Sequence, residues 1–145
     1  MPDRSYFGEK DAQQLAIIKR MAQDLNFRTE IVPCPIIREP DGLAMSSRNS
    51  YLSAEERTAA LVISKSLSLA QNALFNGERD AGAIKRIIVE EISCEPLARI
   101  DYVDVIDAFT LKAIDRIQGS VLIAVAVYIG RTRLIDNFSF KEGCI

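Results

Sequence analysis

The sequence contains no histidine. A chain without histidine has no Ser-His-Asp or Cys-His arrangement, no histidine general acid or base, and no histidine-ligated metal site. Its cysteines, Cys34, Cys94 and Cys144, are odd in number and widely spaced. This spacing fits neither a disulfide framework nor a thiolate metal site, so we expect reduced thiols of an intracellular protein.

The sequence also has no large excess of positive or negative charge, and it has no long apolar run. Its 18 basic and 20 acidic residues give a net charge of −2, which provides no electrostatic footprint for nucleic acid or an anionic membrane. The longest apolar stretch, Val121 to Ile129, is too short to span a bilayer, and the N-terminus has no hydrophobic signal segment. We therefore expect a cytoplasmic location and neither a nucleic-acid nor a membrane partner. Any phosphate that the chain binds must be held by a local cluster of residues.

One such cluster lies between Pro35 and Asn49, with the sequence PIIREPDGLAMSSRN. Gly42 lets the backbone come close to a ligand, Ser46 and Ser47 supply hydroxyl donors, and Arg48 supplies the planar fork that suits phosphate. The pattern predicts an anion-binding loop. The alternative is a surface turn whose serines and arginine are solvated.

A second cluster, YFGEKDAQQ, begins at Tyr6. A short apolar run ends at Gly8, and a charged turn containing Lys10 leads into a helical pattern. This order places free backbone N–H groups and the positive end of a helix dipole at the C-terminal edge of a sheet, where Lys10 adds a charge for phosphate. In the alternative interpretation Asp11 only caps the helix and Lys10 is solvated.

The apolar pattern of the first part predicts a strand–helix–strand unit. We expect strands at Ser5–Gly8 and Arg28–Pro33 and a helix at Ala12–Asn26 with Leu15, Ile18, Ala22 and Leu25 on one face. One crossover between the strands implies a parallel pair. This is the last βαβ portion of a Rossmann-like nucleotide-binding domain, and we place the domain boundary around Leu52, between residues 1–51 and 52–145.

The second part has the pattern of a small α+β domain. Ser53 and Glu56 form a capping box that opens one long helix, with Leu61, Leu69 and other apolar positions, up to Asn76-Gly77, and Asp80 caps a helix at Ala81–Ile92. Strands are expected at Ile100–Asp107, Val121–Ile129 and Thr132–Asp136, with the apolar Val121–Ile129 in the centre. The overall fold class is thus α/β (α+β), with a mostly antiparallel three-stranded sheet in the second domain.

The two clusters together resemble the pantoate–beta-alanine ligase (pantothenate synthetase) family. FGEKDAQQL and PIIREPDGLAMSSRN carry the resemblance, with SSRN in the place of KMSKS in related nucleotidyltransferases, and GERD (Gly77 to Asp80) and RLIDN (Arg133 to Asn137) are also similar. The resemblance covers essentially the whole chain. The family's HxGH motif is absent, so we expect this chain to be the C-terminal half of such an enzyme, without the N-terminal half.

The resemblance implies an ATP- and Mg²⁺-dependent ligase that condenses pantoate with beta-alanine through a pantoyl adenylate. It implies catalytic roles for Lys10, Ser46, Ser47 and Arg48, and pantoate binding by Gln14. It implies ATP binding by Gly8, Glu9, Lys10, Asp11, Ile37, Met45, Ser46, Ser47 and Arg48. Glu9 and Asp11 could help to hold Mg²⁺ through water. It further implies a homodimer in the intact enzyme and a second domain that acts as a lid, and we expect this chain alone to have little or no ligase activity.

Two other interpretations stay open at this point. The chain could be a non-catalytic interaction or regulatory α+β module, in which Val121–Ile129 pairs with a partner if it is an edge strand. It could also be part of a different nucleotidyltransferase that shares the SSRN-type loop, although the match at FGEKDAQQL argues against this.

Overall fold

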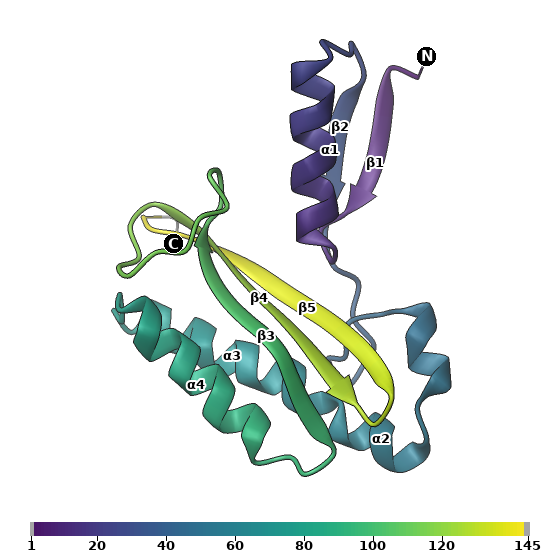
Figure 1. Cartoon of the computed structure of the whole chain (residues 1–145), viewed down its shortest axis with the longest axis vertical. Coiled ribbons are helices and arrows are strands. Elements are labelled where there is room, and N and C mark those ends of the chain that lie inside the picture. The colour runs from purple at the N-terminus through teal and green to yellow at the C-terminus, as the bar shows by residue number, and fades with distance from the viewer. Residues whose placement is uncertain (1, 144–145) are drawn as a thin grey trace.

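The computed structural model describes residues 2–143, which form two units joined by an irregular segment (Figure 1). The N-terminal unit consists of β1 (Arg4–Gly8), α1 (Ala12–Asp24) and β2 (Glu30–Cys34). The strands pair in parallel, with Arg4 opposite Glu30 and Gly8 opposite Cys34, and α1 makes the crossover between them. The expected parallel strand–helix–strand unit is confirmed.

Helix α1 is capped as its sequence predicts but buries less than expected. The Asp11 carboxylate accepts a hydrogen bond from the Gln14 N–H at 3.0 Å, which satisfies a free amide of the first turn. Leu15 and Ala22 are buried, whereas Leu25 is 59% exposed. The prediction that Leu25 belongs to the buried face is wrong, because the helix ends at Asp24 and the two-stranded sheet is too narrow to cover it.

The segment after β2 forms a small hairpin and a 3₁₀ helix. Arg38 pairs with Ala44, and the turn between them contains Gly42 at a φ of +97°, a conformation that glycine adopts without strain. A side chain at Gly42 would meet the Ser64 hydroxyl of the helix beside it, at 3.4 Å. Gly42 therefore allows a tight turn to lie beside that helix, and its expected role in letting a ligand approach the backbone stays a prediction.

The C-terminal unit begins with the 3₁₀ helix η1 (Ser47–Tyr51) and contains three α-helices and three strands. These are α2 (Ala54–Ala59), α3 (Leu61–Phe75), α4 (Ala81–Ser93), β3 (Ala98–Asp107), β4 (Ser120–Ile129) and β5 (Thr132–Lys141). The sheet is antiparallel in the order β3-β4-β5, and α3 and α4 lie across one of its faces (Figure 1). The predicted α+β domain with a central Val121–Ile129 strand is confirmed. Since β4 is paired on both sides, it is not an edge strand that could accept a partner.

The core of the protein lies between this sheet and its two helices. Alternate residues of β4 point to the helices, and they pack against isoleucines and leucines that recur every three or four residues along α3 and α4. The fully buried side chains include Ile63, Leu74, Ile84, Ile88, Ile92, Val121, Ile123, Val125 and Val127. Leu43 of the hairpin joins this core, whereas α1 and its strands contribute nothing to it.

Two elements differ from those expected by more than a shift of one or two residues at an end. The predicted single helix from Ser53 is divided at Ala60 into α2 and α3. At this point the Ile63 N–H donates to the Ala60 carbonyl three residues before it, which is the spacing of a 3₁₀ helix. Within α3, Leu69, assigned to the apolar face, is 40% exposed, because it lies away from the face that buries Leu67, Ala70 and Leu74. Strand β5 continues to Lys141 instead of ending at Asp136, because the polar residues Asp136 and Asn137 are buried and paired within the strand.

Within residues 2–143 no helix is long and apolar enough to cross a bilayer. Cys34 and Cys94 are free thiols. Cys144, also expected to be reduced, lies outside the described residues.

The capping box at the start of α2 gives a direct test of the fold. The Ser53 hydroxyl accepts from the Glu56 N–H at 3.1 Å, and the Glu56 carboxylate accepts from the Ser53 N–H at 2.9 Å. We expect Ser53→Ala to lower the free energy of unfolding by about 1 kcal/mol in urea titrations. Ser68→Ala is the control, since it removes an exposed hydroxyl that donates to the helix carbonyl of Ser64, and we expect it to stay within about 0.5 kcal/mol of wild type. Equal effects of the two changes would contradict the prediction.

Candidate functional site

The turn from Gly8 to Asp11 is held at the end of β1. The Glu9 N–H donates to the Cys34 carbonyl of β2 at 2.8 Å, and Asp11 caps α1. Lys10 lies between these two fixed points and is partly buried, whereas Gly8 and Glu9 are exposed. The sequence therefore places the Lys10 ammonium group beside the start of a helix, where the backbone carries a partial positive charge.

The Ser46–Arg48 segment is fixed from the other side. Ser46 is the N-cap of η1, and its hydroxyl accepts from the Arg48 N–H at 3.2 Å. The Arg48 guanidinium donates to the Arg133 carbonyl of β5 at 3.1 Å, and Asn49 donates to the Ala44 carbonyl at 3.2 Å. Arg48 is thus oriented by β5, although its side chain stays exposed.

These two segments meet in one small pocket of about 270 Å³, which is lined by Lys10, Asp11, Ser46, Arg48, Arg133, Leu134 and Ile135. Of the residues assigned to the site from the sequence, the structure brings together Lys10, Asp11, Ser46 and Arg48. The others lie outside the lining of this pocket: Gly8, Glu9, Gln14, Ile37, Met45 and Ser47. Ile37 and Met45 are 70% and 51% exposed, and the Ile37 carbonyl accepts from the Met45 N–H at 2.9 Å.

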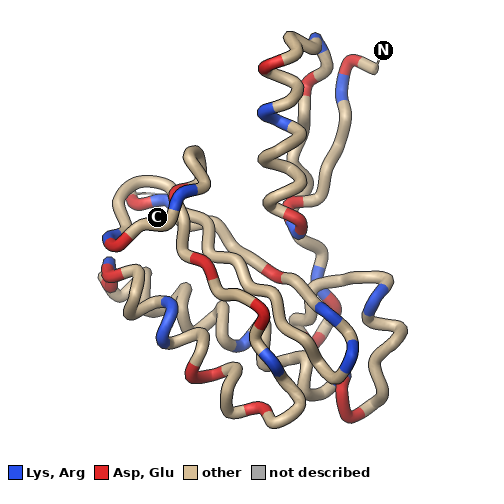
Figure 2. The backbone as a smooth tube through the Cα atoms, in the orientation of Figure 1, with Lys and Arg blue, Asp and Glu red and all other residues tan. Residues whose placement is uncertain are grey.

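The pocket lining holds three basic residues, Lys10, Arg48 and Arg133, and one acidic residue, Asp11. Along the chain as a whole, basic and acidic residues are interspersed (Figure 2). Burial lowers the pKa of Lys10, and the nearby Arg48 and Arg38 guanidinium groups lower it further, while the Asp136 carboxylate opposes this shift. An anion in the pocket would supply the negative charge that Lys10 and Arg48 lack. The arrangement is therefore suited to binding phosphate oxygens.

Arg133 is a pocket residue that the sequence did not single out. Its guanidinium donates to Asp101 of β3 at 2.9 Å, which raises its pKa, and it lies over the Tyr102 ring. The RLIDN motif was the only available signal. Because that motif stands far along the chain from both clusters, its place in the pocket depends on tertiary structure.

Two neighbours of Arg133 on β5 also contact the candidate site. Asp136 is 2% exposed and accepts two hydrogen bonds from Arg38, at 2.7 and 3.0 Å. Asn137 is 5% exposed, and its amide nitrogen donates to the carbonyls of Glu9 and Lys10 at 2.9 and 2.8 Å. Strand β5 therefore contacts both segments that line the pocket.

The carboxylates of the described residues offer little for a metal ion. Residues 2–143 contain no group of three histidine, cysteine, aspartate or glutamate side chains that could hold one. Asp11 is the single carboxylate in the pocket, and one of its oxygens already accepts the helix-capping hydrogen bond. This donor set fits Mg²⁺ only if the ion keeps its waters and takes other ligands from bound phosphates, as Mg²⁺ commonly does.

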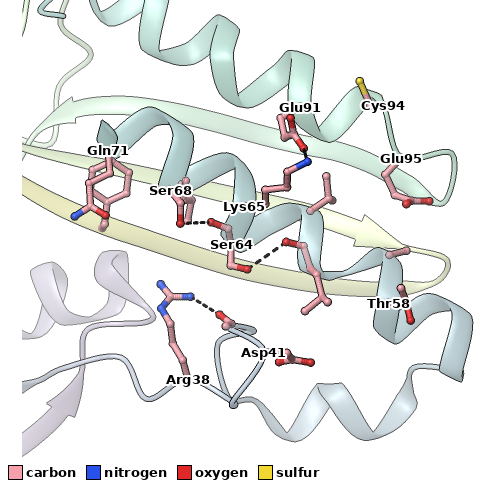
Figure 3. Close-up of a pocket in the computed structure, with 16 residues that line it drawn as sticks. Arg38, Asp41, Thr58, Ser64, Lys65, Ser68, Gln71, Glu91, Cys94 and Glu95 are labelled. Atoms are coloured by element: carbon pink, nitrogen blue, oxygen red, sulfur yellow. Dashed lines mark hydrogen bonds and ion pairs between the residues drawn. The ribbon is translucent and has the colours of Figure 1, made fainter. Parts of the chain in front are cut away.

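Two larger clefts lie outside the phosphate-type pocket. One, of about 700 Å³, separates the hairpin from α3 and the end of α4, and Figure 3 shows Arg38 and Asp41 facing Ser64, Ser68 and Gln71 across it. The other, of about 550 Å³, lies between α1 and the open face of the sheet, beside Leu122 and Asn137. Among the residues that the sequence indicated for the site, Gly42 lines the first cleft and Glu9 lines the second.

The comparisons with known proteins agree on one family. The family model for pantoate-beta-alanine ligase matches residues 1–139. Pantothenate synthetase of Clostridium acetobutylicum is 64% identical over 140 residues, and that of Clostridioides difficile is 59% identical; both matches cover 97% of this chain and 50% of the relative. The chain thus spans about half the length of the curated relatives that it matches.

Solved structures give the same result. Pantothenate synthetase from Thermus thermophilus superposes with a TM-score of 0.90 at 39% identity, covering 94% of this chain and 49% of that one. A pantoate-beta-alanine ligase from Francisella tularensis, solved in complex with beta-gamma ATP and beta-alanine, superposes with a TM-score of 0.60 at 28% identity, covering 94% of this chain and 43% of that one. The match over nearly the whole chain, in sequence and in fold, makes this protein a member of the pantoate–beta-alanine ligase family.

Proposed function

We propose that this chain contributes the phosphate-binding pocket and the lid of an ATP-dependent enzyme that joins pantoate to beta-alanine. The observation that carries the proposal is the meeting of Lys10, Ser46 and Arg48 in one pocket, although they come from separate units of the fold. Membership of the family supports the reaction. The Francisella tularensis relative, which was solved with beta-gamma ATP and beta-alanine, supports ATP and beta-alanine as ligands of the complete site.

The proposed reaction has two steps. The pantoate carboxylate attacks the α-phosphorus of ATP, so that a carboxylate–phosphate bond forms and pyrophosphate leaves. The amine of beta-alanine then attacks the carbonyl carbon of the pantoyl adenylate, and AMP leaves as the amide bond forms. Pantoate is already ionised near neutral pH, so the first step needs no base. It needs in-line positioning and stabilisation of the charge that develops on pyrophosphate.

The pocket residues have side chains suited to this task. In the proposal Lys10 and Arg48 neutralise the phosphates, with Ser46 and Ser47 as hydroxyl donors, and the turn from Gly8 to Asp11 contacts ATP. The backbone at Ile37 and Met45 lies against the adenine, and Gln14 donates to pantoate. Asp11, with Glu9 next to it in the chain, would hold Mg²⁺ through water, and the bound ion would supply further positive charge to the phosphates.

In the same proposal the two units of the chain have different roles. The N-terminal unit belongs to the nucleotide-binding domain, and the C-terminal unit closes over it as a lid. The boundary expected between residues 51 and 52 stays a prediction, and the packing of Leu43 in the C-terminal core favours a hinge nearer to residues 35–37. The homodimer of the intact enzyme and the cytoplasmic location also stay predictions.

ATP binding tests the pocket directly. We expect calorimetric titration of the chain with ATP and Mg²⁺ to give saturable binding, weakened at least about tenfold by Lys10→Ala and by Arg48→Ala, since each change removes a charge-assisted contact. Lys19→Ala is the matched control, because Lys19 lies on α1 but lines the neighbouring cleft, and it should leave the affinity unchanged. Equal losses in all three variants would point to a nonspecific charge effect and contradict the assignment.

A second prediction concerns catalysis. Because the chain has no histidine and therefore no HxGH motif, it lacks part of the machinery that the proposed reaction uses. We expect the purified chain to show no steady release of AMP that depends on both pantoate and beta-alanine. Detection of such release, lost in Lys10→Ala, would show that this half alone forms a working active site.

A further inference from the structure

Two consecutive residues of β5 connect the strand to both segments of the pocket, and we call them the β5 polar pair: Asp136 and Asn137. Consecutive residues of a strand point to opposite faces of the sheet. Asp136 lies opposite Val125 on the face covered by the helices, and Asn137 lies opposite Ala124 on the open face. The pair can therefore hold one segment on each side of the sheet.

On the open face, Asn137 holds the turn that carries Lys10. Its amide nitrogen donates one hydrogen bond to the Glu9 carbonyl at 2.9 Å and one to the Lys10 carbonyl at 2.8 Å. These atoms belong to residues that are 128 and 127 positions apart in the chain. The neighbouring Ala124 is buried and small, so the turn can approach the sheet closely. Both donors of the amide are used, and both act on main-chain atoms.

On the helix-covered face, Asp136 holds the hairpin that leads into Ser46–Arg48. Its two oxygens accept from both terminal nitrogens of Arg38, and Arg38 also donates to the Gly42 carbonyl at 3.1 Å. Figure 3 shows the Arg38 side chain reaching along the hairpin toward this turn. Asp136 additionally accepts from the Asn137 N–H at 2.8 Å, which links the two halves of the pair.

We propose that Asp136 and Asn137 are positioning residues, which set the place of the Lys10 turn relative to the Ser46–Arg48 segment by holding each from β5. Asn137 acts on Lys10 through the main chain, and Asp136 acts through Arg38. The pocket exists only when both segments are in place, because its lining comes from the turn, from the segment after the hairpin and from β5 itself. The functional consequence rests on the proposed phosphate role of Lys10, whereas the positioning itself does not.

The test measures the two segments separately by amide hydrogen exchange in the whole chain. We expect Asn137→Ala to speed exchange in residues 8–11 at least about tenfold while residues 38–45 stay as in wild type, and Asp136→Asn to do the reverse. Ser139→Ala is the control, since it lies on the same face of β5 as Asn137 and no side-chain hydrogen bond joins it to the turn among the described residues. Exchange that is unchanged, or that rises equally in both segments, would overturn the proposal.

A second variant keeps the test decisive if Asn137→Ala fails to fold. Asn137→Asp has the same shape but presents carboxylate oxygens to two carbonyls, so the turn should be loosened at pH 8. Protonation of the introduced carboxylate at low pH restores one hydrogen-bond donor. The exchange rate of residues 8–11, divided by the wild-type rate at the same pH, should then fall part of the way back toward one. A pH-independent ratio would contradict a hydrogen-bonding role. The charged groups around this position are Glu9, Lys10, Asp11, Lys19, Arg20, Arg38, Arg48, Asp104, Arg133 and Asp136.

The pKa of Lys10 reports its position independently of the exchange. It is lowered mainly by burial, so Asn137→Ala should move it back toward its ordinary value in ¹³C NMR of dimethylated lysines, and Ser139→Ala should not. ATP titration then separates the two proposals. A chain that binds no ATP contradicts the proposed function, while the exchange and pKa results still decide the role of Asn137.

Discussion

The arrangement of this protein depends on two polar side chains buried in an edge strand. Asp136 is 2% and Asn137 is 5% exposed, and a buried charge or amide is tolerated only when its hydrogen bonds are satisfied. Arg38 and the carbonyls of Glu9 and Lys10 satisfy them. The Arg38 side chain is 35% exposed, so solvent screens this ion pair in part, and removing one partner costs less than the about 3–5 kcal/mol typical of a fully buried pair. The hairpin and the turn are thus held in place because their removal would leave the buried side chains of Asp136 and Asn137 without hydrogen-bond partners.

The N-terminal unit needs this support because it has almost no core. Leu15 and Ala22 are its buried apolar residues within positions 2–34, and neither joins the cluster between the sheet and α3 and α4. Parallel sheets are normally covered on both faces, whereas β1 and β2 form a sheet of two strands with one helix. The relatives have about twice the length of this chain. The contact with Asn137 is therefore a large share of what orients the unit.

Local signals in the sequence were enough for most of the fold. The capping residues Ser53 and Asp80, the apolar run of β4 and the single crossover between β1 and β2 each act over a short stretch, and each was interpreted correctly. The end of β5 was not, because Asp-Asn usually favours a turn, and only distant partners make it stable inside a strand. For the same reason the motifs that contain Arg38 and Arg133 did not reveal the roles of these two residues, since the roles follow from tertiary contacts. The meeting of Lys10 with Ser46 and Arg48 was expected from the resemblance alone.

A polar connection suits this position better than apolar packing would. Apolar contacts are nondirectional, so they would let the turn slide by fractions of an ångström, whereas two hydrogen bonds from one rigid amide fix both the distance and the orientation of the main chain. They act on the carbonyls of Glu9 and Lys10 and leave the Lys10 ammonium group free for the pocket. The proposed transfer of an adenylyl group to a carboxylate requires such positional accuracy. The register of β5 against β4 therefore determines the geometry of the site. If β5 shifted by one residue, Asp136 and Asn137 would each point to the opposite face of the sheet, away from their partners.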